Sequence, residues 1–439
     1  MKRLVVGICA GLVMLLPRAS YGEGQSEIEV LRKMVEEQNR TINQLLERIE
    51  TLETQQERIE VTQEEQGEWI ESDKAAEPLW AEKVRVKGDF RYRYEHIRDD
   101  SRGNDRDDNR NRNRIRARLG VEAMLSDEID LGFQLATGEV VDANGKDEGD
   151  PVSNNQSLTD AWSLKNIWLS QAYFDYHPAY LPGFSLVGGK MERPFITPVS
   201  SELIWDSDVN PEGGVITYHR SLDQLDLYAN GYGFWVVERS KEGDTGMFGG
   251  QAAAKYNFTA LDDKAHLMGG VSYYDFGNIK GKEFFVDGDS FGNTEDPLIP
   301  GTFAEDFDLF NAFGEFGFKV RGLPVAAFGD YVVNTDADDE DTGWSLGVKV
   351  GKAKEPHTWE VRYLYKDVER DAVLGTFTDS DFGGGGTNTE GHELNFVYAL
   401  AKNWSVAATY FHNDINVDHE PGEKEDDFQR VQLDMIFKF

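Results

Sequence analysis

Five arginines alternate with other residues in the stretch from Asn109 to Leu125, NRNRNRIRARLGVEAML, beginning at Arg110 and ending at Arg118. From Ile115 onward most of the intervening positions are apolar. Because a β-strand sends alternate side chains to opposite faces, the stretch predicts a guanidinium ladder on one face and a hydrocarbon surface on the other. The guanidinium face either pairs with carboxylates or faces water and mobile anions. A soluble sandwich would bury the apolar face, whereas a membrane barrel turns it to lipid and keeps the charges around an aqueous lumen.

A second stretch of the same character begins at Val84, where basic residues alternate with apolar and aromatic ones. The acids on the basic face of the two stretches are Asp89, Glu95 and Glu122. The bases that we expect to line the lumen of a barrel are Arg85, Lys87, Arg91, Arg93, Arg110, Arg112, Arg114, Arg116 and Arg118. Nine bases against three acids predict a wall that pairs with acidic loops folded inward, attracts anions, or does both.

Covalent catalysis has no support in the sequence. The histidines are scattered, and no set of serine, histidine and acid with a recognisable nucleophile turn occurs. Cys9 is the single cysteine and lies in the N-terminal leader, so thiolate catalysis, disulfides, cysteine-ligated zinc and attached c-type haem are excluded from the mature chain. We therefore expect no enzyme activity and assign no catalytic residue, no metal ligand and no cofactor.

Composition restricts the partners. The chain has 439 residues, with 80 acidic against 45 Lys and Arg residues and a formal net charge of −35. A protein without a broad basic surface gains little from counterion release, which argues against nucleic acid as a partner. The acids concentrate in stretches such as 287–308 and 418–427. Their ordinary role is to solvate exposed loops, and bridging by divalent cations stays open as an alternative.

Three segments precede the alternating region. Residues 1–22 combine a basic start, a short apolar run and small residues before the end, which predicts a signal peptide. Residues 23–70 carry apolar residues at heptad spacing, which predicts an α-helical coiled coil that forms a stalk in the periplasm. Residues 71–83 are a polar linker. We expect residues 84–439 to form the barrel.

Sixteen candidate strands follow the linker, with short turns and long polar segments alternating between them almost strictly. The strands are predicted near residues 84–98, 110–125, 128–138, 164–177, 183–190, 213–220, 223–238, 245–258, 264–276, 306–320, 323–333, 343–352, 357–367, 389–400, 403–413 and 427–439. An up-and-down barrel with short periplasmic turns and long outer loops produces this alternation, and a Greek-key sandwich does not. The predicted fold class is an all-β transmembrane up-and-down antiparallel barrel of 16 strands, preceded by an α-helical coiled coil.

The last predicted strand alternates apolar and polar residues and ends on Phe439. A terminal aromatic in this setting resembles the assembly signal of bacterial outer-membrane barrels. It implies the barrel-assembly machinery as a partner through Phe439. Tryptophans near the predicted strand ends fit the aromatic girdles of such barrels, so lipid of the outer membrane is the expected surrounding.

Three predicted loops have distinctive sequences: 150–158 (DPVSNNQSL), 189–195 (GKMERPF) and 205–213 (WDSDVNPEG). Together with the arginine ladder, they resemble segments of the putative-porin family of Gram-negative bacteria, whose members join an N-terminal coiled coil to a barrel. The resemblance covers nearly the whole mature chain. It implies an outer-membrane channel of 16 strands that forms a homo-oligomer, a trimer being favoured and a dimer staying open.

Long loops that fold inward narrow the channels of such barrels, and the segments 139–163 and 191–212 are the candidates here. The charged residues expected at the constriction are Asp150, Lys190, Glu192, Arg193, Asp206, Asp208 and Glu212. A basic wall opposite an acidic loop creates a transverse field that orders polar solutes and rejects apolar ones.

The predicted function is passive diffusion of small hydrophilic solutes, with a lean to anions that the net charge opposes. A second class of function stays open: a scaffold whose barrel holds a partner protein, or a tether that links the membrane to the cell wall through the stalk.

Overall fold

The computed structural model describes residues 83–439 except for 103–108, 144, 200, 242, 261–262 and 418–424, together with Lys33, Glu36, Glu37 and Arg40. The predicted signal peptide, coiled coil and linker lie almost entirely outside the described residues, and so does most of the acidic stretch 418–427. Within the described part of the chain, no helix is long and apolar enough to cross a membrane.

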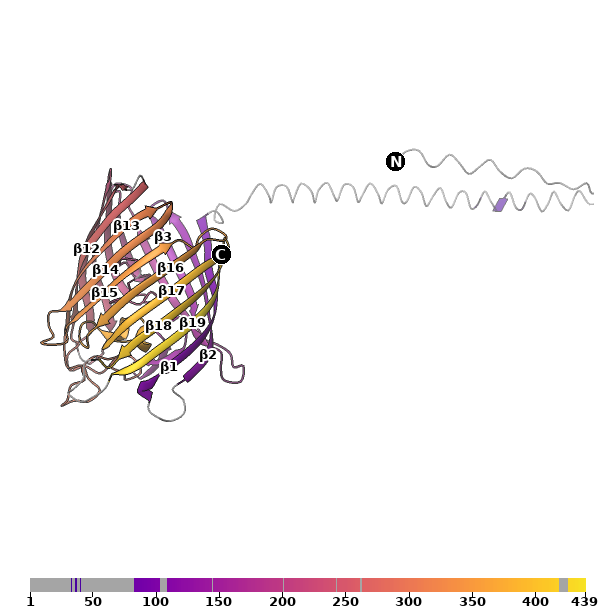
Figure 1. Ribbon diagram of the computed structural model, residues 1–439. Coiled ribbons are helices and arrows are strands. Elements are labelled where there is room, and N and C mark those ends of the chain that lie inside the picture. Colours follow the sequence, from indigo (N-terminus) through magenta and orange to yellow (C-terminus); the bar gives the residue numbers. More distant parts are fainter. Residues whose placement is uncertain are drawn as a thin grey trace, which may run out of the picture. The chain divides into compact units, whose positions relative to one another are not determined.

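Sixteen antiparallel strands close into a barrel, which confirms the predicted fold (Figure 1). The wall runs through β1 (Val84–Asp99), β2 (Asn109–Ser126), β3 (Ile129–Thr137), β7 (Ile167–Tyr176), β8 (Phe184–Lys190), β9 (Glu212–Leu222), β10 (Leu225–Val237), β11 (Thr245–Ala260), β12 (Asp263–Gly277), β13 (Phe307–Val320), β14 (Leu323–Asn334), β15 (Thr342–Gly351), β16 (Trp359–Val368), β17 (Thr389–Ala401), β18 (Trp404–Ile415) and β19 (Asp426–Lys438). The ring closes because β1 pairs with both β2 and β19. Every predicted strand is present, with boundaries shifted by a few residues.

Short elements lie in the long connections. The hairpin of β4 (Val140–Ala143) and β5 (Lys146–Gly149) and the two-residue β6 (Gln156–Ser157) follow β3, and β6 pairs with the middle of β2. The 3₁₀ turns are η2 (Asp100–Arg102), η3 (Gly375–Phe377) and η4 (Phe382–Gly384). The connections used below are loop 138–166, loop 191–211, loop 278–306 and loop 369–388. All four lie at the same end of the barrel, the long-loop end, and the opposite end carries the short turns.

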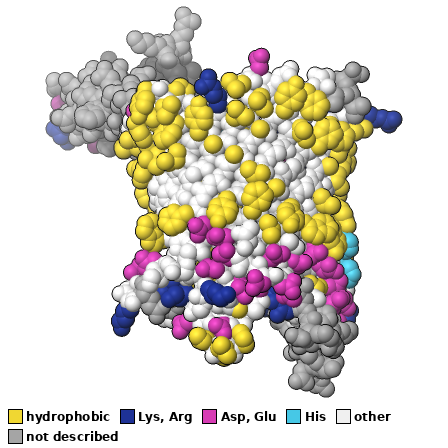
Figure 2. All heavy atoms as spheres, turned by 90° about the vertical axis from the view of Figure 1, so that its left-hand side faces the viewer, with side chains coloured by type: hydrophobic (Ala, Val, Ile, Leu, Met, Phe, Trp, Pro, Cys, Tyr) yellow, Lys and Arg dark blue, Asp and Glu magenta, His cyan; other side chains and the backbone are white. Residues whose placement is uncertain are grey.

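The outer face of the wall is apolar. Alternate residues of the strands, such as Leu119 on β2 and Leu433 on β19, are exposed there, and Phe90 lies beside Phe437 with ring centroids 6.3 Å apart. Figure 2 shows hydrophobic side chains in an upper and a lower row, with acidic side chains gathered toward the long-loop end. The ladder arginines occupy the opposite face. The predicted inversion of a soluble fold, with hydrocarbon outside and charge inside, is therefore present along these strands.

The interior is not ionised throughout, and this corrects the simplest picture from strand alternation. Near the long-loop end of β9 to β16, inward side chains such as Phe234, Tyr274 and Phe307 are buried against residues of loops 191–211, 278–306 and 369–388. Phe195 stacks on Trp205 at 4.8 Å between ring centroids. The loops thus enter the barrel by packing apolar side chains on one part of its inner wall, and this hydrophobic contact holds them there.

Closure of the ring brings the end of the chain against the start of β1. The backbone N–H of Gly88 donates to the carbonyl oxygen of Phe439, and the N–H of Phe439 donates to that of Gly88, both at 3.0 Å. A Cβ atom on residue 88 would lie 2.3 Å from the Arg118 carbonyl oxygen and 2.6 Å from the Phe439 ring. Glycine is therefore required for this close approach.

We expect Gly88→Ala to destabilise the closed barrel by about 1–3 kcal/mol, because backbone or ring atoms must move to admit the methyl group. The measurement is the temperature at which an unheated sample loses its compact electrophoretic mobility. Gly277→Ala is the matched control, since a Cβ atom at that strand glycine, at the end of β12, meets nothing within 4 Å. Equal melting of the two variants would show that closure does not depend on Gly88.

Candidate functional site: the arginine wall and the inward loops

The ladder of β2 points inward, and an aspartate of β1 joins two of its arginines. Asp89 accepts from Arg116 Nε at 3.0 Å and from Arg118 Nε at 2.6 Å. Arg118 Nη1 also reaches Asp208 of loop 191–211 at 3.2 Å, and Arg116 Nη1 reaches the same oxygen at 3.7 Å. Loop 191–211 is therefore tied to the wall by charge as well as by its apolar contacts.

Arg93 is the centre of a second group of contacts. Its Nε and Nη2 donate to both carboxylate oxygens of Asp434 on β19, at 2.7 and 2.9 Å, and its Nη1 donates to Asp381 of loop 369–388 at 2.9 Å. Arg430 Nη1 donates to Asp381 as well, at 2.6 Å. Two-pronged contacts of this kind are the strongest pairings an arginine makes. Asp381 thus fastens a second inward loop to the wall.

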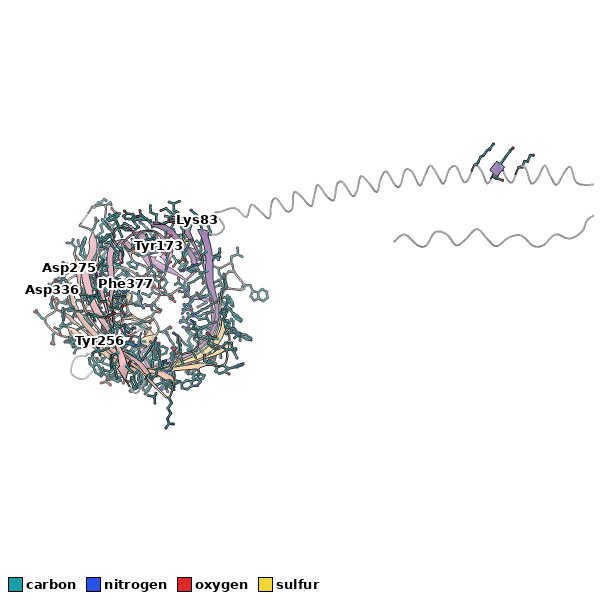
Figure 3. All side chains as sticks on the ribbon, turned by 90° about the horizontal axis from the view of Figure 1, so that it is seen from above. Lys83, Tyr173, Tyr256, Asp275, Asp336 and Phe377 are labelled. Atoms are coloured by element: carbon teal, nitrogen blue, oxygen red, sulfur yellow. The ribbon has the colours of Figure 1, made fainter. Side chains whose placement is uncertain are left out.

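Loop 369–388 was missed as an inward loop by the sequence analysis, which named only segments 139–163 and 191–212. The signal that could have found it is local. Two aspartates, Asp379 and Asp381, precede a run of four glycines, Gly383 to Gly386, all with positive φ. Such a run permits the tight backbone path that an L residue disfavours. Figure 3 shows Phe377 of this loop inside the ring of strands.

The other predicted wall residues lie nearer the two ends of the barrel than Arg93 does, or contact loop 138–166. Arg112 pairs with Glu95, and Arg114 lies 3.5 Å from Glu139 of loop 138–166. Arg91 donates to the side-chain oxygen of Asn155, in the same loop, at 2.5 Å. Toward the short-turn end, Lys87 and the exposed Arg85 both face Glu122. Arg110 is exposed at the long-loop end, where it lines a small polar pocket with Glu139 and Lys165.

The predicted constriction residues have different surroundings. Among these seven residues, the structure gives only Asp208 a contact with the ladder. Lys190 pairs with Glu212 at 2.7 Å, and Arg193 Nη1 donates to the Trp205 carbonyl oxygen at 2.6 Å. Asp150 accepts from the N–H of Val152 at 2.9 Å within its own turn, and Glu192 is exposed. Asp206 accepts from the N–H of Ser380 at 2.9 Å, which connects the two inward loops.

Three carboxylates, those of Glu202, Asp206 and Asp379, meet between the inward loops with oxygen atoms within 4.8 Å of one another. Oxygen donors in this number suit a hard divalent cation. However, Lys366 Nζ lies 3.1 Å from Asp379 and already supplies one positive charge. The sequence analysis assigned no metal ligand, and nothing in the pattern of the sequence brings these three residues together.

The acids of the inward loops fall into two electrostatic groups. Burial raises the pKa of Glu202 to about 7, and the neighbouring Asp379 adds to the shift. Burial and the carboxylate of Glu202 likewise hold the pKa of Asp206 well above its usual value. For Asp208 and Asp381, burial acts in the same direction, but the arginines beside them outweigh it and lower the pKa. The first group favours protons, and the second stays ionised.

A closed barrel of 16 antiparallel strands, with an apolar outer face, a charged inner wall and loops folded inward, defines a transmembrane β-barrel channel of the porin class. The chain belongs to the family described as "Putative porin", whose model matches residues 101–294 and 311–437. This family and this fold indicate an outer-membrane channel rather than an enzyme. The predicted resemblance is thereby confirmed.

Solved porins share the architecture at low sequence identity. Pseudomonas putida OprB, in a high-pH structure, is 11% identical over 82% of this chain and 95% of its own, with a TM-score of 0.51. Salmonella typhi OmpF is 11% identical over 81% of this chain and 97% of its own, with a TM-score of 0.47. A mutant of the Rh. blastica porin is 12% identical over 81% and 100%, with a TM-score of 0.44. At such identities, similarity concerns the fold alone. No curated protein matches the chain in sequence.

The raised pKa of Glu202 makes the packing of loop 191–211 dependent on pH. Its ordinary value is 4.5, so the packed loop binds a proton more tightly than a detached loop does. The stabilisation is complete below about pH 4.5 and is lost as the pH rises through about 7.

We therefore expect backbone hydrogen exchange in residues 201–206, corrected for intrinsic rates, to speed up between about pH 5 and pH 8. Glu202→Gln should flatten this dependence because an amide does not titrate. Glu212→Gln, at the exposed start of β9 just after this loop, is the control that keeps the pH dependence. An unchanged pH dependence in Glu202→Gln would refute the assignment to this carboxyl group.

Proposed function

We propose that the protein is a passive diffusion channel of the outer membrane for small hydrophilic solutes, with a weak preference for anions. The observation that carries the proposal is the inner wall formed by β1, β2 and β19, whose arginines exceed the carboxylates that meet them. The described side chains also leave an uncovered area within the strand ring when the barrel is viewed from above (Figure 3).

The charge balance of this wall supports the lean to anions. Its guanidinium groups are those of Arg91, Arg93, Arg112, Arg114, Arg116, Arg118 and Arg430, and the carboxylates within 4 Å of them are those of Asp89, Glu95, Glu139, Asp208, Asp381 and Asp434. Within the described residues, seven positive charges thus meet six negative ones. Arg85 and Lys87 add two more against Glu122. Local charge in the lumen outweighs the net charge of the whole chain in setting selectivity.

Loops 191–211 and 369–388 form the proposed constriction, with loop 138–166 beside them. Asp208 and Asp381 hold two of these loops against the basic wall and stay ionised, whereas Glu202 and Asp206, in the cluster with Asp379, favour protons. The ionised groups thus lie on the side of β1, β2 and β19, and this uneven distribution of charge supports a transverse field that favours polar solutes over apolar ones. The predicted pore-lining role of the ladder and the constriction role of the loop residues are part of this proposal.

The scaffold alternative has less support. The inward loops bury a set of aromatic and aliphatic side chains inside the barrel, and so they take up room that a protein partner would need. A tether through the stalk concerns residues outside the described part of the chain and remains compatible with a channel.

We expect the channel to show a reversal potential of anion-selective sign in a planar bilayer under a KCl gradient. The double variant Arg85→Gln/Lys87→Gln should shift this potential toward cation selectivity, because it removes two positive charges from the less buried end of the wall and leaves Glu122. Lys402→Gln, in an exposed short turn, is the control that changes net charge outside the lumen. An unshifted potential in the double variant would contradict the role of the wall, and the absence of open currents would contradict the channel.

The assembly proposed is a homotrimer in outer-membrane lipid, a dimer being the second choice, with Phe439 read by the barrel-assembly machinery and the coiled coil in the periplasm. Small residues on the outer face of β10 to β12, including Gly231, Ala252 and Gly269, are exposed. They would let a neighbouring barrel approach closely, and Figure 2 shows the smooth band between the apolar rows on this side.

Native mass spectrometry of the protein in detergent should then give three times the mass of one chain. Ala252→Trp should shift the distribution to single chains, because an indole ring on this band blocks close approach. Ala117→Trp is the matched control, since this exposed alanine lies on the outer face of β2, away from the band. A single-chain mass for the unmodified protein, or loss of the trimer in both variants, would count against this interface.

A further inference from the structure

We propose that Arg91 is an anion-binding subsite of the lumen, which takes a small oxyanion: the carboxylate or phosphate group of a passing solute. The inference rests on the proposed channel for the route by which the anion arrives. It assigns to one residue the surplus positive charge of the seven guanidinium groups counted above.

Arg91 lacks a counterion among the described residues, since no carboxylate of theirs lies within 4 Å of it. Each of the other six guanidinium groups counted above has one. In the strand register, Arg91 faces Arg116 on β2 and Ile436 on β19, so one neighbour is a like charge and the other is apolar.

Two acids that flank Arg91, one on its own strand and one on the neighbouring strand β19, are already occupied. Asp89, two residues before it on β1, binds Arg116 and Arg118. Asp434 on β19 gives both of its oxygens to Arg93. Either acid would have to leave a hydrogen-bonded guanidinium group to serve Arg91. The surplus charge is therefore fixed at this position by the geometry of its neighbours.

The side chain that accepts a hydrogen bond from Arg91 is neutral. Arg91 Nη2 donates to Asn155 Oδ1 at 2.5 Å, and the amide nitrogen of Asn155 donates in turn to Ser153 Oγ at 3.1 Å. Arg91 Nε is buried and has no hydrogen-bond partner among the described residues. The amide orients the guanidinium group but does not neutralise it, so the residue keeps an unmet requirement for negative charge and for an acceptor.

An oxyanion meets both requirements. The planar guanidinium group presents parallel N–H donors that match two oxygens of a carboxylate or a phosphate. A bound monoanion also gives the seven guanidinium groups counted above an equal number of negative charges within reach. Chloride would be attracted by the positive charge but cannot accept the two parallel hydrogen bonds. Oxyanions should therefore compete with chloride at this position.

The test is a binding titration of the purified, folded protein in detergent by calorimetry, with inorganic phosphate in one arm and acetate in the other. Arg91→Gln should weaken binding about tenfold, and Arg91→Lys, which keeps the charge but loses the fork, should give an intermediate loss. The two arms separate the sources: a loss with phosphate only assigns phosphorylated solutes, and a loss with acetate assigns carboxylate solutes. Unchanged binding in Arg91→Gln in both arms overturns the subsite.

Two control variants accompany the titration. Lys402→Gln changes the net charge by the same amount outside the lumen and should bind the anions as the unmodified protein does. Arg118→Gln should lose less affinity than Arg91→Gln because the charge of Arg118 is already compensated. An equal loss in Arg118→Gln would assign binding to the total charge of the wall and overturn the proposal. Compact electrophoretic mobility verifies folding of each variant, and Arg91→Lys carries the test should Arg91→Gln fail to fold.

Bilayer recording on the same preparations separates this inference from the proposed function. Open currents without binding that depends on Arg91 overturn the subsite and leave the channel. Binding that depends on Arg91 without open currents supports the subsite and overturns the channel.

Discussion

The pairing of guanidinium groups with carboxylates inside the barrel is the interaction on which the rest of the lumen depends. Asp208 and Asp381 come from loops that lie far along the chain from β1 and β2, and each binds two arginines of the wall. Because both partners are largely removed from water, breaking one contact leaves an uncompensated charge at a cost of about 3–5 kcal/mol. The loops are therefore held in one position inside the barrel, where they form the proposed constriction.

Strand alternation predicted which side chains form the inner wall but not which side chains they contact. The period of two in residues 84–125 fixed which side chains of β1 and β2 face inward, since register on a barrel leaves no other choice. It carries no information on what meets them. Arg93 contacts Asp434 and Asp381 across 341 and 288 positions of sequence, and no local pattern encodes pairings of that range. For the same reason, the cluster of Glu202, Asp206 and Asp379 could not be foreseen.

The apolar interior shows a second limit of the sequence reading. In a barrel, aromatic residues at strand ends are expected at the lipid girdle. For a tryptophan in a long loop, the sequence does not indicate where the side chain lies. Trp205 lies inside, 5.4 Å between ring centroids from Tyr274 of β12. The surface that faces lipid and the surface under the loops consist of the same types of apolar residue. On strands, the alternation of the sequence tells the two surfaces apart. In loops, only the folded structure shows which of them a residue belongs to.

The energetics of the wall bear on why the arginines are present at all. Loops could be held by hydrophobic contact alone, because replacing a buried ion pair with well-packed apolar groups is often neutral or stabilising. The apolar cluster beneath loops 191–211 and 369–388 already does this on one side. Stability therefore does not account for an array that desolvates seven guanidinium groups and leaves Arg91 without a carboxylate among the described residues. The field proposed above, across the path of a charged solute, would account for it, since such a field requires the charges to be fixed and not fully compensated.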